Sequence, residues 1–213
     1  MIVMASADID KAVQFAVASS FENAGQMCTS TERIYVDERV ADEFEQKVVA
    51  LARRYQVGSW DQQHVNIGPI VNPKQHANIL SQLEDAHAKG AKFLLGKPHY
   101  ELPYIQPTVV TGIIPNMTLE QDETFGPVVA ISRFNHLSEA VERANASPYG
   151  LAAVVFGGAG ANDVAEQMEA GMVAINKGAG GLGPWVGAKQ SGFGFHGTAA
   201  GHRQFAQVRV INK

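Results

Sequence analysis

The chain has 213 residues, 46% apolar and 18% charged, and its 17 basic and 21 acidic residues give a net charge of −4. This length suits one domain or one lobe of a larger enzyme. The absence of a basic run argues against nucleic acid or an anionic membrane surface as a partner, and no apolar stretch is long enough to span a bilayer.

Strand-like and helix-like periodicities alternate along the chain. The predicted elements in chain order are strand 2–5, helix 8–21, strand 33–36, helix 40–55, helix 73–89, strand 91–96, strand 104–113, strand 127–134, helix 138–146, strand 150–157, helix 162–171, strand 172–176 and strand 206–212. Pro107 suggests that 104–113 is an edge strand, because proline cannot donate to a sheet ladder. The alternation predicts an α/β fold with a largely parallel sheet flanked by helices.

A glycine-dense loop covers residues 178–197 and contains the formal G-x-G-x-x-G run "GFGFHG" (192–197). A dinucleotide-binding fingerprint requires a preceding strand, a following helix and an acidic residue about 20 positions on. This run follows a loop, and the chain ends before such an acid. We therefore favour a loop whose glycines adopt positive φ angles.

Cys28 is the only cysteine, so the chain cannot form an internal disulfide, and no Cys/His cluster predicts a metal site. We expect a protein of a reducing compartment, the cytoplasm, because the start of the chain also lacks a signal-peptide pattern. Asn23 and Gly25 predict a helix end just before the cysteine, and the partial negative charge of a helix end does not activate a thiol. The residues alone leave three alternatives: a buried apolar side chain, which is the common state of a free cysteine, an incidental redox site, or a nucleophile.

The run "FENAGQMC" (21–28) resembles the active-site signature of the aldehyde dehydrogenase superfamily. Five further runs resemble that family in the same order: "IGPIVNPKQ" (67–75), "DETFGPVVAI" (122–131), "ANASPYGLAA" (144–153), "GMVAIN" (171–176) and "PWVGAKQSGFG" (184–194). The chain is thus similar to the carboxyl-terminal, catalytic-cysteine portion of the family.

The resemblance implies three parts of the chain. Residues 1–30 would be a remnant strand and helix of the cofactor lobe leading to the cysteine loop. Residues 31–197 would form the catalytic lobe, and 198–213 a helix turn with an oligomerisation strand around 208–211.

The resemblance also implies oxidation of an aldehyde to a carboxylic acid with NAD or NADP. Cys28 would attack the aldehyde to give a thiohemiacetal, and hydride loss would leave a thioester that water hydrolyses. Glu123 would accept hydrogen bonds from the nicotinamide-ribose hydroxyls, and Phe125 would pack near the nicotinamide. Taken alone, Glu123 reads as a solvated loop charge and Phe125 as a core residue.

Asn176 would brace the cysteine loop. Alternatively, Asn176 is an asparagine at a strand end whose side chain binds the backbone of a turn. Trp185 would line the substrate pocket. The chain departs from the family pattern at Val186, where the family commonly has glycine, and at Phe195-His196, where an Arg-Glu pair often stands. A Cys–His dyad with His196 or His202 is disfavoured, because neither histidine has an orienting partner in the sequence and the family uses none.

In the family, the main cofactor lobe, the general-base glutamate and the oxyanion-hole asparagine precede the cysteine. We therefore expect an incomplete cofactor site and little or no activity from this truncated chain. Ile2, Val3, Ile9 and Val13 would be exposed unless the chain repacks or self-associates, and a homo-oligomer through the last strand is expected. Two alternative functions are a non-catalytic module that docks on full-length subunits and a thiol-dependent esterase.

Overall fold

A seven-stranded sheet forms the centre of the computed structural model, which describes residues 1–179 and 183–212. Its strand order is β3-β4-β5-β2-β1-β7-β8. The strands are β1 (Ile2–Val3), β2 (Arg33–Asp37), β3 (Lys92–Leu95), β4 (Thr108–Thr111), β5 (Val128–Phe134), β7 (Ala152–Phe156) and β8 (Met172–Ile175). Every neighbouring pair is parallel except β3 and β4, which confirms the predicted largely parallel sheet.

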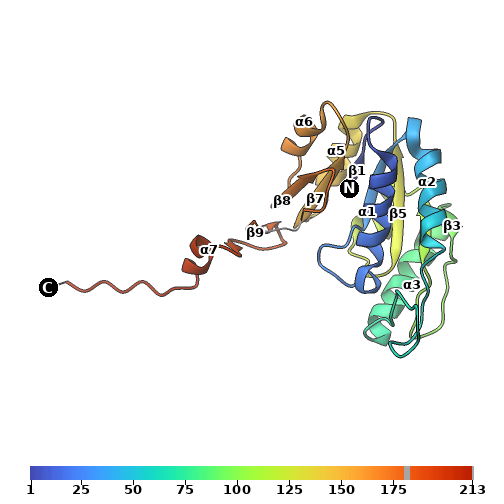
Figure 1. Cartoon of the computed structure of the whole chain (residues 1–213), viewed down its shortest axis with the longest axis horizontal. Coiled ribbons are helices and arrows are strands. Elements are labelled where there is room, and N and C mark those ends of the chain that lie inside the picture. Colours follow the sequence, from blue (N-terminus) through green and yellow to red (C-terminus); the bar gives the residue numbers. More distant parts are fainter. Residues whose placement is uncertain (180–182, 213) are drawn as a thin grey trace.

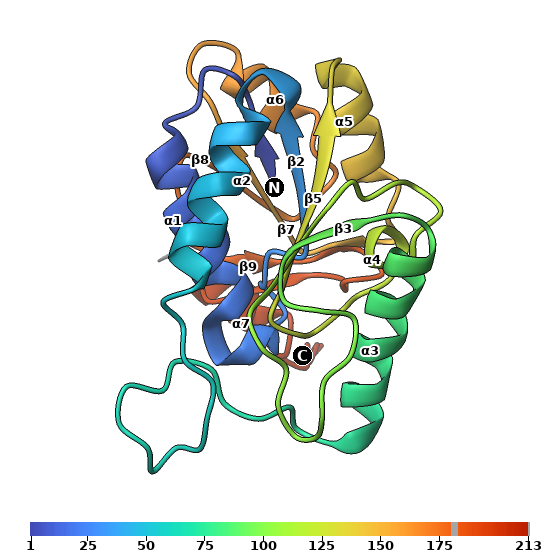
Figure 2. The ribbon, with the colours of Figure 1, turned by 90° about the vertical axis from the view of Figure 1, so that its right-hand side faces the viewer.

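Helices flank this sheet (Figure 1). They are α1 (Ile9–Phe21), α2 (Glu38–Ala52), α3 (Pro73–Ala88), α4 (Thr118–Gln121), α5 (Leu137–Asn145), α6 (Ala161–Glu166) and α7 (Ala199–Arg203). Helices α1 and α2 lie side by side in Figure 2. Their buried residues share one core cluster with those of α3, whereas α5 and α6 pack in a second cluster. Within the described residues, no helix combines the length and apolarity needed to cross a membrane.

Local sequence signals explain where the long helices begin. The side chains of Asp8, Asp37 and Asn72 each accept a hydrogen bond from a backbone N–H in the first turn of α1, α2 and α3. These bonds satisfy donors that a helix start leaves without a partner. Side-chain alternation then divides β2 between two faces, because Ile34 and Val36 pack in one buried cluster and Tyr35 packs in the other.

The first strand lies in the middle of the sheet, between β2 and β7. Ile2 and Val3 are fully buried, and Ile9 and Val13 of α1 are 9% and 4% exposed. These four residues were expected to be exposed unless the chain repacks or self-associates, and they are buried within the single chain, because β7, far along the sequence, supplies the second neighbour of β1. The origin of residues 1–30 in a cofactor lobe stays a prediction.

The predicted edge strand around Pro107 is also wrong. Strand β4 lies between β3 and β5, and Pro107 immediately precedes its first residue. The missing N–H of the proline therefore costs no ladder hydrogen bond.

The carboxyl-terminal part differs from the prediction at its end. The glycine loop contains the short strands β9 (Trp185–Val186), β10 (Ala188–Lys189) and β11 (Phe195–His196); β9 pairs with β11, and β10 with β6 (Tyr149–Gly150). Gly192, Gly194 and Gly197 have positive φ angles, as predicted. The predicted strand at 206–212 is not formed within this chain, where the segment extends away from the body (Figure 1). An extended segment without a neighbouring strand has no partner for its backbone groups.

A buried ion pair fixes the region just ahead of β5. Glu120 on α4 accepts hydrogen bonds from the Tyr35 hydroxyl and from Arg143 Nε, both at 3.0 Å. The Arg143 guanidinium also lies over the Tyr35 ring, 5.2 Å from its centroid. The side chains of Arg143 and Glu120 are only 13% and 8% exposed, so each charge depends on the other.

Glu120→Ala is expected to lower the free energy of unfolding by about 3 kcal/mol, because it leaves the Arg143 charge buried without its partner. Urea denaturation measures this loss. Glu139→Ala is the matched control, since Glu139 lies 3.7 Å from the same guanidinium but is 48% exposed. The control should cost less than about 1 kcal/mol, and equal losses in the two variants would contradict the assignment.

Candidate active site

A left-handed turn carries the chain from α1 to Cys28. Asn23, Ala24 and Gly25 follow the helix with φ angles of 51°, 58° and 71°, which no right-handed helix can accommodate. This confirms the predicted helix end at Asn23 and Gly25. The turn places Cys28 in a loop, where the residue is exposed rather than part of the core.

The loops before β2 and β5 meet because these two strands are parallel neighbours, with Arg33 opposite Ala130. The first loop contains Cys28 and the second contains Glu123. Ligand sites of open parallel sheets usually lie at the carboxyl ends of the strands, whereas these loops meet at the amino ends. Cys28 and Glu123 thus lie at the amino-terminal edge of the sheet, whereas the usual ligand site of such folds lies at the carboxyl-terminal edge.

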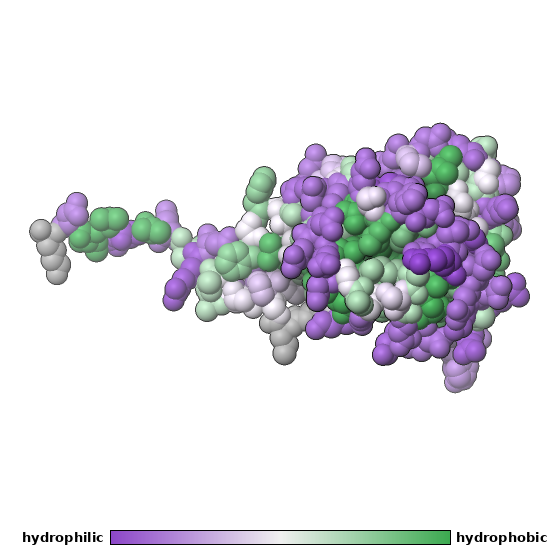
Figure 3. All heavy atoms as spheres, turned by 90° about the horizontal axis from the view of Figure 1, so that it is seen from above, coloured by the Kyte–Doolittle hydropathy of each residue, from purple (hydrophilic) through white to green (hydrophobic). Residues whose placement is uncertain are grey.

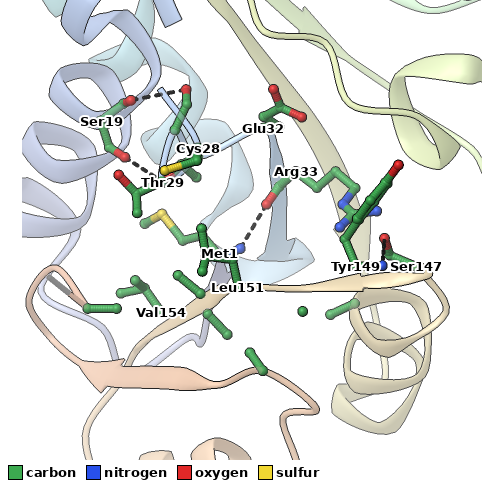
Figure 4. Close-up of a pocket in the computed structure, with 18 of the residues that line it drawn as sticks. Met1, Ser19, Cys28, Thr29, Glu32, Arg33, Ser147, Tyr149, Leu151 and Val154 are labelled. Atoms are coloured by element: carbon green, nitrogen blue, oxygen red, sulfur yellow. Dashed lines mark hydrogen bonds between the residues drawn. The ribbon is translucent and has the colours of Figure 1, made fainter. Parts of the chain in front are cut away.

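A cavity of about 640 Å³ lies along this amino-terminal edge and is lined by both Cys28 and Glu123. Figure 4 shows this cavity with Cys28 among its labelled residues. Its wall comes from residues just ahead of several strands: Met1 before β1, Glu32 before β2, Asp122 before β5, Leu151 before β7 and Ala170 before β8. The thiol is therefore accessible from a hollow that also contains a carboxylate.

The cysteine loop and the Glu123 loop touch through two glycines. A Cβ atom on Gly25 would lie 2.1 Å from the carbonyl oxygen of Gly126 and 2.9 Å from that of Ser20. No real side chain is tolerated at such distances from backbone atoms. Gly25 is thus required both for its positive φ and for this close approach.

Gln26 joins a third segment to the cysteine loop. Its side chain donates to the carbonyl of Pro69 at 3.3 Å and accepts from the backbone N–H of Val71 at 2.9 Å. Runs 21–28, 67–75 and 122–131, separated in the sequence, thus converge around Cys28.

Glu32 is a functional candidate that the sequence reasoning missed. Its carboxylate accepts hydrogen bonds from the backbone N–H groups of Thr124 at 3.0 Å and Phe125 at 2.7 Å. Burial raises the pKa of Glu32 to about 7, although the two N–H groups oppose this shift. The partners lie 92 and 93 positions away, so no local pattern could have shown the contact.

The structure separates the other predicted site residues. Phe125 is half-buried with a φ of 50°, and neither it nor Trp185 lines the cavity with Cys28. Trp185 instead stacks on His196, with ring centroids 6.3 Å apart and an angle of 6° between the planes. The pocket-lining assignment of Trp185 therefore has no support from the cavity.

Asn176 takes the alternative role weighed for it, at the end of a strand. Its side chain accepts from the backbone N–H of Gly157 at 3.0 Å and donates to the carbonyl of the same residue at 2.8 Å. These bonds tie the residue after β8 to the residue after β7. Both bonds lie at the carboxyl ends of the strands, whereas the cysteine loop lies at the amino ends. These two bonds therefore do not brace the cysteine loop.

Comparisons with known proteins show the family of the chain. The family model described as "Aldehyde dehydrogenase family" matches residues 1–211. Glutarate-semialdehyde dehydrogenase of Pseudomonas putida and an NADP(+) succinate-semialdehyde dehydrogenase of Escherichia coli are each 33% identical to this chain over 99% of its length and 45% of theirs.

Solved structures give the same result. An aldehyde dehydrogenase from Brucella melitensis matches with a TM-score of 0.90 at 36% identity, over 94% of this chain and 42% of the other. Succinate-semialdehyde dehydrogenase from Burkholderia pseudomallei matches with a TM-score of 0.87 at 38% identity, over 92% and 42%. The chain spans less than half the length of these relatives.

Proposed function

Because this chain belongs to the aldehyde dehydrogenase family, we propose that it is the catalytic portion of an NAD(P)-dependent enzyme that oxidises an aldehyde to a carboxylic acid through Cys28. The observation that carries the proposal is the exposure of Cys28 in a cavity shared with Glu123. A cysteine that only filled space would be buried, as free cysteines usually are.

In this proposal the Cys28 thiolate adds to the aldehyde carbon, and the carbonyl oxygen becomes the oxyanion of a thiohemiacetal. The Cys28 backbone N–H helps to hold that oxyanion. Loss of hydride from the same carbon leaves a thioester, and water then displaces the thiol to give the acid. Sulfur suits both steps, because it adds readily as thiolate and leaves readily from a thioester.

NAD or NADP supplies the hydride acceptor when it is bound. Glu123 fits a contact with its ribose, because the residue is exposed at the cavity and an ionised carboxylate offers two acceptor oxygens to a pair of adjacent hydroxyls. Phe125 follows two positions later and is assigned to the nicotinamide end. The proposal assigns the general base and the remaining cofactor contacts to groups outside residues 1–213. The isolated chain should therefore have little or no activity.

A direct assay tests the proposal. Residues 1–213 are joined to the amino-terminal part of a relative such as the Escherichia coli enzyme, and the chimera is incubated with NAD or NADP and a panel of aldehydes. Appearance of the reduced cofactor supports the function, and the isolated chain should show far less. A folded chimera that oxidises none of the aldehydes would contradict it.

We also propose that the chain assembles with other subunits through its carboxyl-terminal segment. The exposed apolar residues of this segment favour docking on another subunit. Val208, Val210 and Ile211 are 88%, 78% and 68% exposed on the extended segment. Figure 3 shows an arm that stands clear of the body and carries hydrophobic surface. Val208 and Val210 lie on one face of an extended segment, and apolar residues so placed suit addition to the sheet of another subunit.

Val208→Asp is expected to weaken self-association by about 10- to 100-fold, because a carboxylate replaces a side chain whose burial contributes about 1.5–3 kcal/mol. Sedimentation equilibrium measures the dissociation constant. Gln207→Asp is the matched control, since it adds the same charge at the neighbouring position, which faces the opposite side of an extended strand. A wild-type chain that is monomeric at micromolar concentration would remove the proposal.

A further inference from the structure

Three side chains bind the backbone of the Glu123 loop. Glu32 accepts the N–H groups of Thr124 and Phe125. Gln82 donates to the carbonyl of Glu123 at 3.1 Å and accepts from the Thr124 hydroxyl at 2.8 Å. Gln75 donates to the carbonyls of Thr124 and Phe125, at 2.8 and 3.2 Å. Side chains therefore bind both the N–H groups and the carbonyl groups of this short loop.

The loop needs this support because its backbone is strained. Phe125 has a φ of 50°, a left-handed conformation that costs a residue with a side chain about 1–3 kcal/mol. Such a conformation persists only where neighbouring contacts enforce it. Glu32 supplies the acceptors for the N–H of the strained residue and for that of the residue before it, so its loss would release the loop most directly.

Glu32 also belongs to the segment that contains the nucleophile. It lies four positions after Cys28 and immediately before β2. In Figure 4 the Glu32 carboxyl group is directed away from the Cys28 sulfur. Since both of its oxygens bind the other loop, Glu32 connects the two loops and is not placed to take a proton from the thiol.

We propose that Glu32 is a positioning residue that holds the Glu123 loop, and with it the Glu123 carboxylate, in a fixed place relative to Cys28. The cofactor role of Glu123 in this inference rests on the proposed function. The positioning itself rests only on the two hydrogen bonds and on the strained backbone between the loops.

The charge state of Glu32 gives the inference a second signature. The ionised carboxylate offers an acceptor oxygen to each N–H, whereas protonation turns one oxygen into an O–H donor. Its pKa of about 7 reflects burial and the nearby Glu123 charge, which raise it, against the two N–H groups and Arg33, which lower it. The amide signals of Thr124 and Phe125 should therefore titrate near pH 7, because protonation of Glu32 removes the acceptor oxygen from one of the two N–H groups.

Amide hydrogen exchange, followed by NMR on the full chain, tests the positioning. In Glu32→Gln the exchange of the Thr124 and Phe125 amides should become at least about tenfold faster, because the amide group of glutamine presents a donor to one of the two N–H groups. The midpoint near pH 7 should vanish from both signals. Glu22→Gln is the matched control, since Glu22 lines the same cavity at the end of α1, and it should change neither amide.

The amides of β5, such as that of Val129, report whether each variant is folded. Should Glu32→Gln fail to fold, Glu32→Asp keeps the charge on a side chain one carbon shorter and should lose protection at one or both amides. Unchanged exchange at Thr124 and Phe125 in a folded variant would overturn the proposal.

A nucleotide titration separates this inference from the proposed function. Nicotinamide mononucleotide added to the wild-type chain should shift the Glu123 signals, and Glu32→Gln should weaken that response about tenfold. A wild-type chain that shows no response would overturn the cofactor role of Glu123, whereas the exchange result would still decide whether Glu32 fixes the loop.

Discussion

Replacing Cys28 with serine is expected to lower aldehyde oxidation about 10³-fold or more in a chimera that contains residues 1–213, because a serine hydroxyl neither ionises nor leaves as readily as a thiol. The loss should appear in kcat, with a much smaller change in the KM for the cofactor. Steady-state measurement of cofactor reduction gives both values. Rapid-quench detection of the acyl-enzyme would show no thioester in the variant.

Met27→Leu is the control for this substitution. Met27 lines the same cavity beside Cys28, and the exchange roughly conserves side-chain volume. Its effect on kcat should stay within about threefold. A serine variant that kept the wild-type rate would show that Cys28 is not the nucleophile and would also remove the thiol-esterase alternative if ester turnover were unchanged.

Gly25→Ala is expected to destabilise the fold by about 4–5 kcal/mol, enough to unfold a marginally stable protein. Two costs add. The φ of 71° strains any residue that has a side chain, and the new methyl group would lie 2.1 Å from the Gly126 carbonyl oxygen. The neighbour is backbone, so it cannot rotate away. Urea denaturation followed by circular dichroism measures the loss.

Gly112→Ala separates these two costs. Gly112 has a similar φ of 76°, but nothing lies within 4 Å of the position that its Cβ would occupy. Only the strain remains, and the expected loss is about 1–2 kcal/mol. Equal losses in the two variants would mean that the contact between the cysteine loop and the Glu123 loop is not as close as described.

The sequence predicted the candidate nucleophile and the ribose-binding candidate but not the residue that joins them. Cys28 and Glu123 each stand in a distinctive run, which local comparison can detect. Glu32 stands in no such run, and its partners are far away in sequence. Trp185 and Asn176 show the converse, because their runs resemble the family while their contacts differ from the roles that the resemblance implies. Trp185 stacks on His196, and Asn176 binds the backbone of Gly157, as the strand-end alternative predicts.

The sequence by itself determined the order of the longer strands and helices up to β8, the turn after α1 and the family, because these depend on residues close together in the chain. Only the tertiary structure decided that β1 is a central strand, that β4 is internal and that the loops before β2 and β5 line one cavity. The physical reason is that strand neighbours are chosen by burial and hydrogen bonding across the whole chain. Periodicity records which face of a strand is buried, but it contains no information about which strand lies beside it.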